Sequence, residues 1–257
     1  MSQAVLNEKT FQPGYAAMPE GAVAGTAPGT EVGSREEAMT LGGTVSRTLL
    51  LLSLTVAFAF VGWNMAESVL TTSPWLMLGG FAILLMLSFA AVKNPRLAAP
   101  LGFLYAVLMG TWMGAISRVY DAQWDGIVLQ AVGASIAVFL GCLILYGTGA
   151  VKVTNKFRSV VITATFGVLF LYLGALVLSL FGLDFLWTSN PLSIGVSVVV
   201  CIIASLNLFL DFDFIQRGVA MGAPRSMEWL AAFGLITTLV WLYLEILRLL
   251  ALLQGNR

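Results

Sequence analysis

Three acidic residues interrupt apolar sequence in the last quarter of the chain. Asp211 and Asp213 lie in LNLFLDFDFIQRG, and Glu245 lies in VWLYLEILRLL. A charged side chain at the centre of a membrane helix costs about 3 kcal/mol, so such residues usually face the bundle interior and serve ion or proton movement. Because the chain contains no histidine, any proton chemistry must use carboxylates such as these, or tyrosine or lysine.

The spacing of the first two acids separates them. Residues two apart on a helix point about 200° apart, so Asp211 and Asp213 cannot share one face. Asn207 lies one turn before Asp211 and can form a polar face with it toward the bundle. Asp213 can form an ion pair with Arg217, four residues later. Asp211 is therefore the stronger functional candidate, and Asp213 is better explained as the polar end of a helix near water.

Glu245 lies deep in the last apolar segment. It follows Glu228 by about 17 residues, which is roughly 25 Å of helix. Arg248, three residues later, could neutralise it in a structural intrahelical pair. Its other neighbours are apolar, which favours a functional acid with a specific partner.

The composition predicts an integral membrane protein. Of 257 residues, 59% are hydrophobic and 10% are charged, with a mean hydropathy of +0.92, whereas soluble domains carry roughly 25% charged residues. The 13 basic and 13 acidic residues balance, so a nucleic-acid partner is not indicated. The two cysteines, Cys142 and Cys201, lie in apolar runs and suit buried packing better than a disulfide or a metal site. We expect neither an enzyme nor a bound cofactor, because no nucleophile–base arrangement appears.

The elements that must position these acids are seven apolar segments in an all-α membrane domain. Each is near the roughly 20 residues that a helix needs to cross a bilayer. They cover residues 45–66, 75–92, 98–118, 125–147, 158–182, 192–214 and 228–253. Residues 1–43 are rich in Gly, Ala and Pro and predict a disordered cytoplasmic tail before a domain at 44–254. Ser34 or Thr40 could cap the first helix.

The basic residues predict a cytoplasmic amino terminus and an extracytoplasmic carboxyl terminus. With seven crossings, the positions on the inner side are Lys9, Arg35, Arg47, Lys93, Arg96, Lys152, Lys156, Arg158, Arg217 and Arg225. The outer side retains only Arg118 and Arg257. Four acids near the outer face, Glu67, Asp121, Asp125 and Asp184, could concentrate cations but are better explained as solvated loop residues. Gly110 and Gly114 form a GxxxG spacing that allows close helix approach.

The last two segments resemble the Bax inhibitor family of membrane proteins. LDFDFIQRG stands where that family has a YDTQ-like stretch on its sixth helix, and LYLEILRLLALL stands where it has a LYLDIINLFLRLL-like stretch on its seventh. The similarity in layout covers most of residues 45–253. It implies that Glu245 is the acid of the seventh helix and Asp211 that of the sixth, with Asp213 as the alternative.

The resemblance implies a pH-sensitive calcium leak in a bacterial plasma membrane. In the family the two acids face each other, share protons and gate the leak. Two carboxylates in a low-dielectric site cannot both ionise cheaply. Asp211 and Glu245 would then sense protons and bind calcium transiently, supported by Asn207, Arg217 and Arg248. The alternative is a non-transporting regulator of a membrane protease or stress-response partner. A small-solute transporter would require an internal repeat, and none is evident.

Two departures from the family pattern concern the acids. The second acid is glutamate, and its separation from Asp211 is wider by roughly two or three helical turns. A hairpin with its turn near Gly222 would place Asp211 opposite about Leu235. The structure must therefore show whether the Asp211 side chain reaches Glu245.

Overall fold

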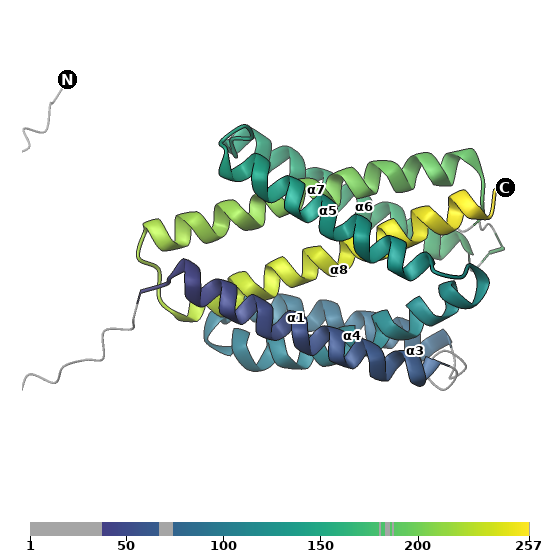
Figure 1. The fold of residues 1–257 in the computed structure, drawn as a ribbon, viewed down its shortest axis with the longest axis horizontal. Coiled ribbons are helices and arrows are strands. Elements are labelled where there is room, and N and C mark those ends of the chain that lie inside the picture. The colour runs from purple at the N-terminus through teal and green to yellow at the C-terminus, as the bar shows by residue number, and fades with distance from the viewer. Residues whose placement is uncertain (1–37, 67–73, 180, 183–185, 187, 257) are drawn as a thin grey trace, which may run out of the picture. The chain divides into compact units, whose positions relative to one another are not determined.

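A computed structural model describes the chain except for residues 1–37, 67–73, 180, 183–185, 187 and 257, and the side chains of 74–79, 81 and 82. Each of the seven predicted segments corresponds to one long α-helix (Figure 1). These are α1 (Leu41–Asn64), α3 (Pro74–Lys93), α4 (Ala98–Gln123), α5 (Ile127–Gly147), α6 (Asn155–Ser179), α7 (Pro191–Ala220) and α8 (Ser226–Gln254). A single 3-10 turn, η2 (Pro95–Leu97), joins α3 to α4.

Several helix limits differ from the prediction. Helix α4 ends five residues later than expected and α7 six residues later, because the polar residues after each apolar run continue the helix. Asp121 therefore belongs to α4 rather than to a loop. Helix α1 begins at Leu41, before the predicted domain start, and its cap at Thr40 is confirmed: the Thr40 hydroxyl accepts a hydrogen bond from Gly43 N at 3.0 Å. The alternative cap, Ser34, and the predicted tail up to residue 37 lie outside the described residues.

The all-helical membrane architecture is confirmed. Among the described residues, six helices are long and apolar enough to cross a membrane, and α3 contributes a shorter apolar stretch, Ile83–Lys93. Within the described ranges the only extended pairing is one isolated antiparallel bridge, between Ala38 and Pro224. Seven crossings and the sides on which the termini lie remain predictions.

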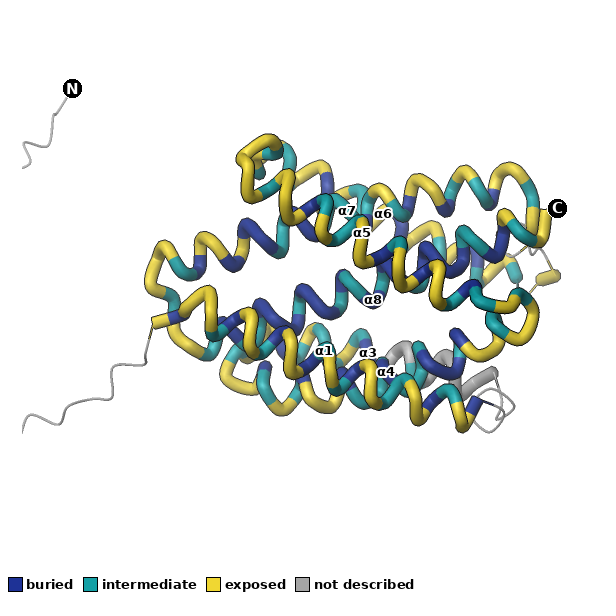
Figure 2. Tube along the Cα trace, in the orientation of Figure 1, coloured by how far each residue is buried: buried dark blue, intermediate teal, exposed yellow. Residues whose placement is uncertain are grey.

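Helix α8 is the central helix of the bundle. It contacts α1, α4, α5 and α7, and Figure 1 shows it running between α1, α3 and α4 on one side and α5, α6 and α7 on the other. Of its most apolar stretch 67% is buried, whereas no other candidate span exceeds 33%. Figure 2 shows this burial along most of its length. A polar residue on α8 is therefore held inside protein rather than against lipid.

The GxxxG glycines of α4 pack inside the chain. A Cβ on Gly110 would overlap the carbonyl of Thr55, and one on Gly114 would overlap that of Ala59. Both carbonyls belong to α1, so the two backbones approach closely, as small residues permit. The predicted close approach is confirmed, and its partner is α1.

The α7–α8 hairpin turns at Gly222, as predicted. Gly222 has φ +62°, a left-handed conformation that glycine adopts at little cost. The hairpin lays α7 antiparallel against α8 and fixes which residues of the two helices face each other. It thereby determines the surroundings of Asp211.

Candidate functional site

Asp211 lies against the first half of α8. Its Oδ1 is 3.6 Å from the position that a Cβ would take on Gly234, and the Thr238 side chain is within hydrogen-bonding reach of its carboxylate. Its Oδ2 is buried and, among the residues described, has no hydrogen-bond partner. The predicted position opposite about Leu235 is confirmed. This arrangement leaves one Asp211 carboxylate oxygen inside the bundle without a hydrogen-bond partner among the described residues.

Glu245 lies two helical turns farther along α8 than Thr238. Seven residues correspond to about 10 Å of helix rise, so Asp211 and Glu245 occupy different levels of the bundle. The structure does not bring together the two acids that the family resemblance pairs. The wider spacing noted in the sequence is not absorbed by the loop, because the α7–α8 turn is tight.

Glu245 is instead surrounded by its own partners. It is only 4% exposed, and its Oε1 accepts a hydrogen bond from Ser197 of α7 at 2.6 Å and one from Arg248 at 3.2 Å. Its Oε2 accepts one from the Tyr172 hydroxyl of α6 at 2.7 Å. The intrahelical pair with Arg248, which was the structural alternative for Glu245, is present, and both carboxylate oxygens are occupied.

Arg248 extends this cluster to the loop between α6 and α7. It is 8% exposed, donates to the Tyr172 hydroxyl at 2.5 Å and to the carbonyl of Leu186 at 2.7 Å. Its guanidinium also lies over the Tyr172 ring, 5.2 Å from the centroid. A buried charge pair is stable only when further hydrogen bonds satisfy it, and this cluster provides them.

Asp213 forms the predicted ion pair with Arg217 and a second one with Arg158. Arg217 Nε donates to its Oδ1 at 2.9 Å, and Arg158 of α6 donates to its Oδ2 at 2.7 Å. Asp213 was predicted as the polar end of a helix near water, but its carboxylate is itself buried, with the residue only 7% exposed. Its two arginines are about half exposed instead, so they shield the carboxylate from water.

Asn207 faces α6. Its amide donates to the Thr165 hydroxyl at 2.8 Å and to the carbonyl of Ile203 at 2.9 Å. It lies one turn from Asp211, as predicted, but its amide donates to Thr165 of α6 and to Ile203 of its own helix α7 rather than to the acid.

The described residues contain no group of three or more metal-binding side chains that could hold a metal ion. Cys142 and Cys201 are free. Of the four predicted outer acids, Asp121 accepts a hydrogen bond from Gly126 N at 3.2 Å and Asp125 is exposed. Glu67 and Asp184 lie outside the described residues. Transient calcium binding at Asp211 and Glu245 remains a prediction.

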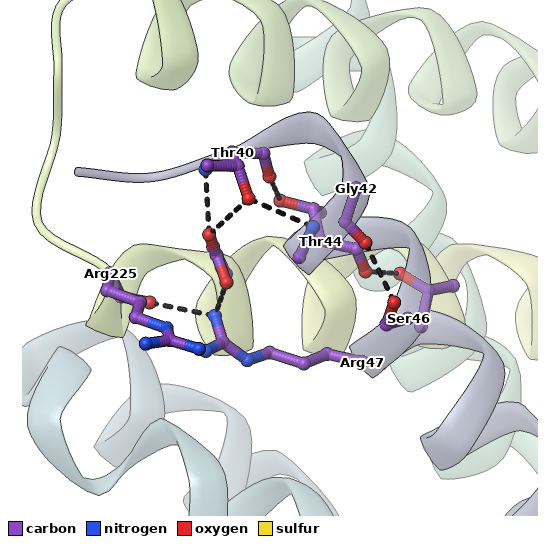
Figure 3. A network of polar contacts seen from close by, with 9 residues as sticks. Thr40, Gly42, Thr44, Ser46, Arg47 and Arg225 are labelled. Carbon is purple, nitrogen blue, oxygen red and sulfur yellow. Dashed lines mark hydrogen bonds and ion pairs between the residues drawn. The ribbon is translucent and has the colours of Figure 1, made fainter. Parts of the chain in front are cut away.

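Glu228 was not identified from the sequence as a site residue. It is 1% exposed and forms an ion pair with Arg47 of α1, while its Oε1 accepts hydrogen bonds from Thr40 (Figure 3). Its position in the first turn of a helix suggests an exposed acid that interacts favourably with the helix dipole. Tyr172 and Ser197 were also missed. The sequence does not distinguish them, because the same apolar runs contain other polar residues, such as Thr165 on α6 and Ser205 on α7.

The comparisons with known proteins agree with this architecture. The family model described as Bax inhibitor 1 like matches residues 5–255, which is nearly the whole chain. A search of curated proteins returned no match. An all-helical membrane bundle with acids on its last two helices, together with a family match of this extent, shows that the chain belongs to the Bax inhibitor 1 like family.

Proposed function

We propose that the protein is a pH-sensitive cation leak, with calcium as the expected ion and Asp211 as the proton-sensing carboxylate. The observation that carries this proposal is the buried Asp211 Oδ2, which has no hydrogen-bond partner among the described residues. A buried polar atom without a partner is destabilising and requires an explanation. Binding of a proton or a cation provides one.

The ionised form of Asp211 is the conducting form in this proposal. A negative carboxylate between α7 and α8 attracts a cation, and the Thr238 hydroxyl adds an oxygen ligand of the kind that calcium accepts. Protonation removes the charge and converts the carboxylate into a hydrogen-bond donor. Cation flux is therefore expected to decrease as the pH falls.

Glu245 has a different role from the one that the family pattern implies. Its carboxylate is neutralised by Arg248 and bound by Tyr172 and Ser197. We propose that this cluster fixes α6 and the α6–α7 loop to α8, so that the helices around Asp211 keep a defined spacing. Glu245 then affects the leak through helix position rather than by sharing a proton with Asp211.

Calcium flux into proteoliposomes tests the proposal. The wild-type protein should carry flux above protein-free vesicles, and Asp211→Asn should abolish its pH dependence while leaving the protein folded. Asp125→Asn is the matched control, because Asp125 is an exposed acid at the α4–α5 turn. Wild-type flux equal to that of protein-free vesicles would refute the proposal, as would an unchanged pH profile in Asp211→Asn.

The alternative proposal is a non-transporting regulator that binds a membrane partner. One observation favours it, an open apolar groove of about 550 Å³ between α6 and α7. Its walls include Gly167, Val168 and Leu171 of α6 and Gly195, Val199 and Ile203 of α7. A partner that co-purifies with wild type and with Asp211→Asn, but is lost when Gly195 is replaced by leucine, would support this alternative.

A further inference from the structure

Three residues ahead of α1 are fixed to the turn between α7 and α8. We call Ala38–Thr40 the strap. Ala38 forms an antiparallel bridge with Pro224, and Met39 N donates to the carbonyl of Ala223 at 2.7 Å. Met39 is only 2% exposed and belongs to the main apolar core of the bundle. The strap is therefore docked into the hairpin and closes its end.

The polar contacts of the strap converge on one buried carboxylate. Glu228 Oε1 accepts from Thr40 N at 2.7 Å and from the Thr40 hydroxyl at 3.0 Å. Its Oε2 pairs with Arg47, which also donates to the carbonyl of Arg225 at 3.0 Å and lies over the ring of Trp229. Figure 3 shows the polar contacts of Thr40 and Arg47 joining the start of α1 to the start of α8. The Glu228 carboxylate is thus the polar link between the strap and the start of α8.

Two glycines make the docked arrangement possible. A Cβ on Gly43 would overlap the Glu228 carboxylate, and a Cβ on Gly218 would lie 2.6 Å from Met39 Sδ. The Glu228 carboxylate and the Met39 side chain thus occupy space that only glycine leaves open. Gly42, the neighbour of Gly43, has no atom within 4 Å of its Cβ position.

We propose that the strap is a latch that holds the leak closed at the α7–α8 end of the bundle; this inference rests on the proposed function. Met39 covers Gly218, which is seven residues, about 10 Å of helix, from Asp211. Met39 also shares the apolar core with Phe212 and Ile215 of α7. With the strap docked, this core seals the hairpin end between water and Asp211. Undocking removes Met39 from that seal and frees the hairpin to move.

The latch has the physical properties of a two-state element. It is short, and it is joined to the bundle through its backbone pairing with the α7–α8 turn, one apolar side chain and one buried ion-pair cluster. Segments of this kind change between ordered and released states as units. A change of modest energy at the Glu228 cluster therefore shifts the whole strap.

Gly43→Ala and Gly42→Ala form a matched pair that tests the latch. Alanine raises helix propensity at either position, but only the Gly43 variant displaces the Glu228 carboxylate. Because disruption of one partner in a buried ion pair shifts a two-state equilibrium by at least a factor on the order of ten, Gly43→Ala should raise calcium flux about tenfold. Gly42→Ala should leave the flux unchanged.

A disulfide provides the opposite perturbation. Directly opposed residues in an antiparallel pair have Cβ atoms about 5 Å apart, close enough for a disulfide after a small adjustment. The double variant Ala38→Cys/Pro224→Cys, oxidised and verified by thiol counting, should carry less flux than wild type, and a reductant should restore the flux. Each single cysteine variant should be indifferent to the reductant.

The outcomes distinguish the latch from the leak itself. If wild-type vesicles conduct while Gly43→Ala matches Gly42→Ala, or if the oxidised pair conducts like the reduced pair, the latch is refuted and the proposed leak stands. Failure of the cysteine pair to cross-link would contradict the docked strap. If wild-type vesicles show no flux above protein-free vesicles, the proposed function fails, and the latch fails with it.

Discussion

Arg248→Met provides the sharpest test of the Glu245 cluster. Methionine keeps an unbranched apolar side chain but removes the donors to Glu245, to the Tyr172 hydroxyl and to the Leu186 carbonyl. Hydrogen bonds inside membrane proteins contribute about 0.6 kcal/mol each, so their loss alone would cost about 2 kcal/mol. The variant also leaves the Glu245 carboxylate buried without its cation. We therefore expect a total loss of about 3–5 kcal/mol in the free energy of unfolding.

The double variant Glu245→Gln/Arg248→Met separates the two contributions. It removes the positive and the negative charge together, so no uncompensated buried charge remains. Replacing both members of a buried pair by neutral residues is often close to neutral. The double variant should therefore be more stable than Arg248→Met alone, although it carries one more substitution.

Reversible unfolding in mixed detergent micelles, followed by circular dichroism, measures these differences. Arg217→Met is the control, because Arg217 is a half-exposed partner of Asp213, which retains Arg158. Its loss should cost at most about 1 kcal/mol. A loss below about 1 kcal/mol for Arg248→Met, or a double variant less stable than the single one, would refute the assignment of Glu245 to Arg248.

Two glycine substitutions, one control substitution and one thiol-labelling experiment test the packing. Gly114→Ala should destabilise the protein by about 1–3 kcal/mol, because the added Cβ overlaps the Ala59 carbonyl. Gly133→Ala on α5 is the control: its added Cβ meets no atom within 4 Å, so it should be neutral or stabilising in the same unfolding assay. Gly222→Ala should lower the free energy of unfolding by about 1 kcal/mol, since an L-residue at positive φ is strained; an unchanged unfolding midpoint would contradict the turn. Cys142, which is buried, should resist a membrane-impermeant thiol reagent until the protein unfolds, and rapid labelling of the folded protein would contradict its position.

Features determined by local sequence were predicted correctly. The helices follow from apolar segments long enough to cross a bilayer, and the Thr40 cap follows from side-chain chemistry at a helix start. The pairs Asp213–Arg217 and Glu245–Arg248 join residues three or four apart, which a helix brings together. The position of Asp211 opposite the first half of α8 follows from a tight turn and a fixed rise per residue.

The sequence predicted a close helix approach at Gly110 and Gly114, but it did not predict which helices contribute the partners of Glu245, Glu228 and Asp213. Periodicity does not specify that Tyr172 of α6 and Ser197 of α7 reach the same carboxylate on α8. The burial of Glu228 depends on Arg47, which lies on α1 at the other end of the domain sequence. Asp213 was expected near water because the sequence did not indicate that Arg158 approaches it from a different helix. In each case the missing information was the choice of neighbouring helix.

The pH dependence of calcium flux in wild type and Asp211→Asn, compared in the same vesicles, tests the central proposal most directly. We predict that wild-type flux falls on acidification, because protonation removes the charge that attracts the cation, and that Asp211→Asn carries a low flux at every pH. Glu245→Gln should retain the pH dependence of the flux, since the carboxylate that it removes is held by Arg248 in the wild-type protein. Flux in Asp211→Asn that follows the wild-type pH profile would contradict the proposal.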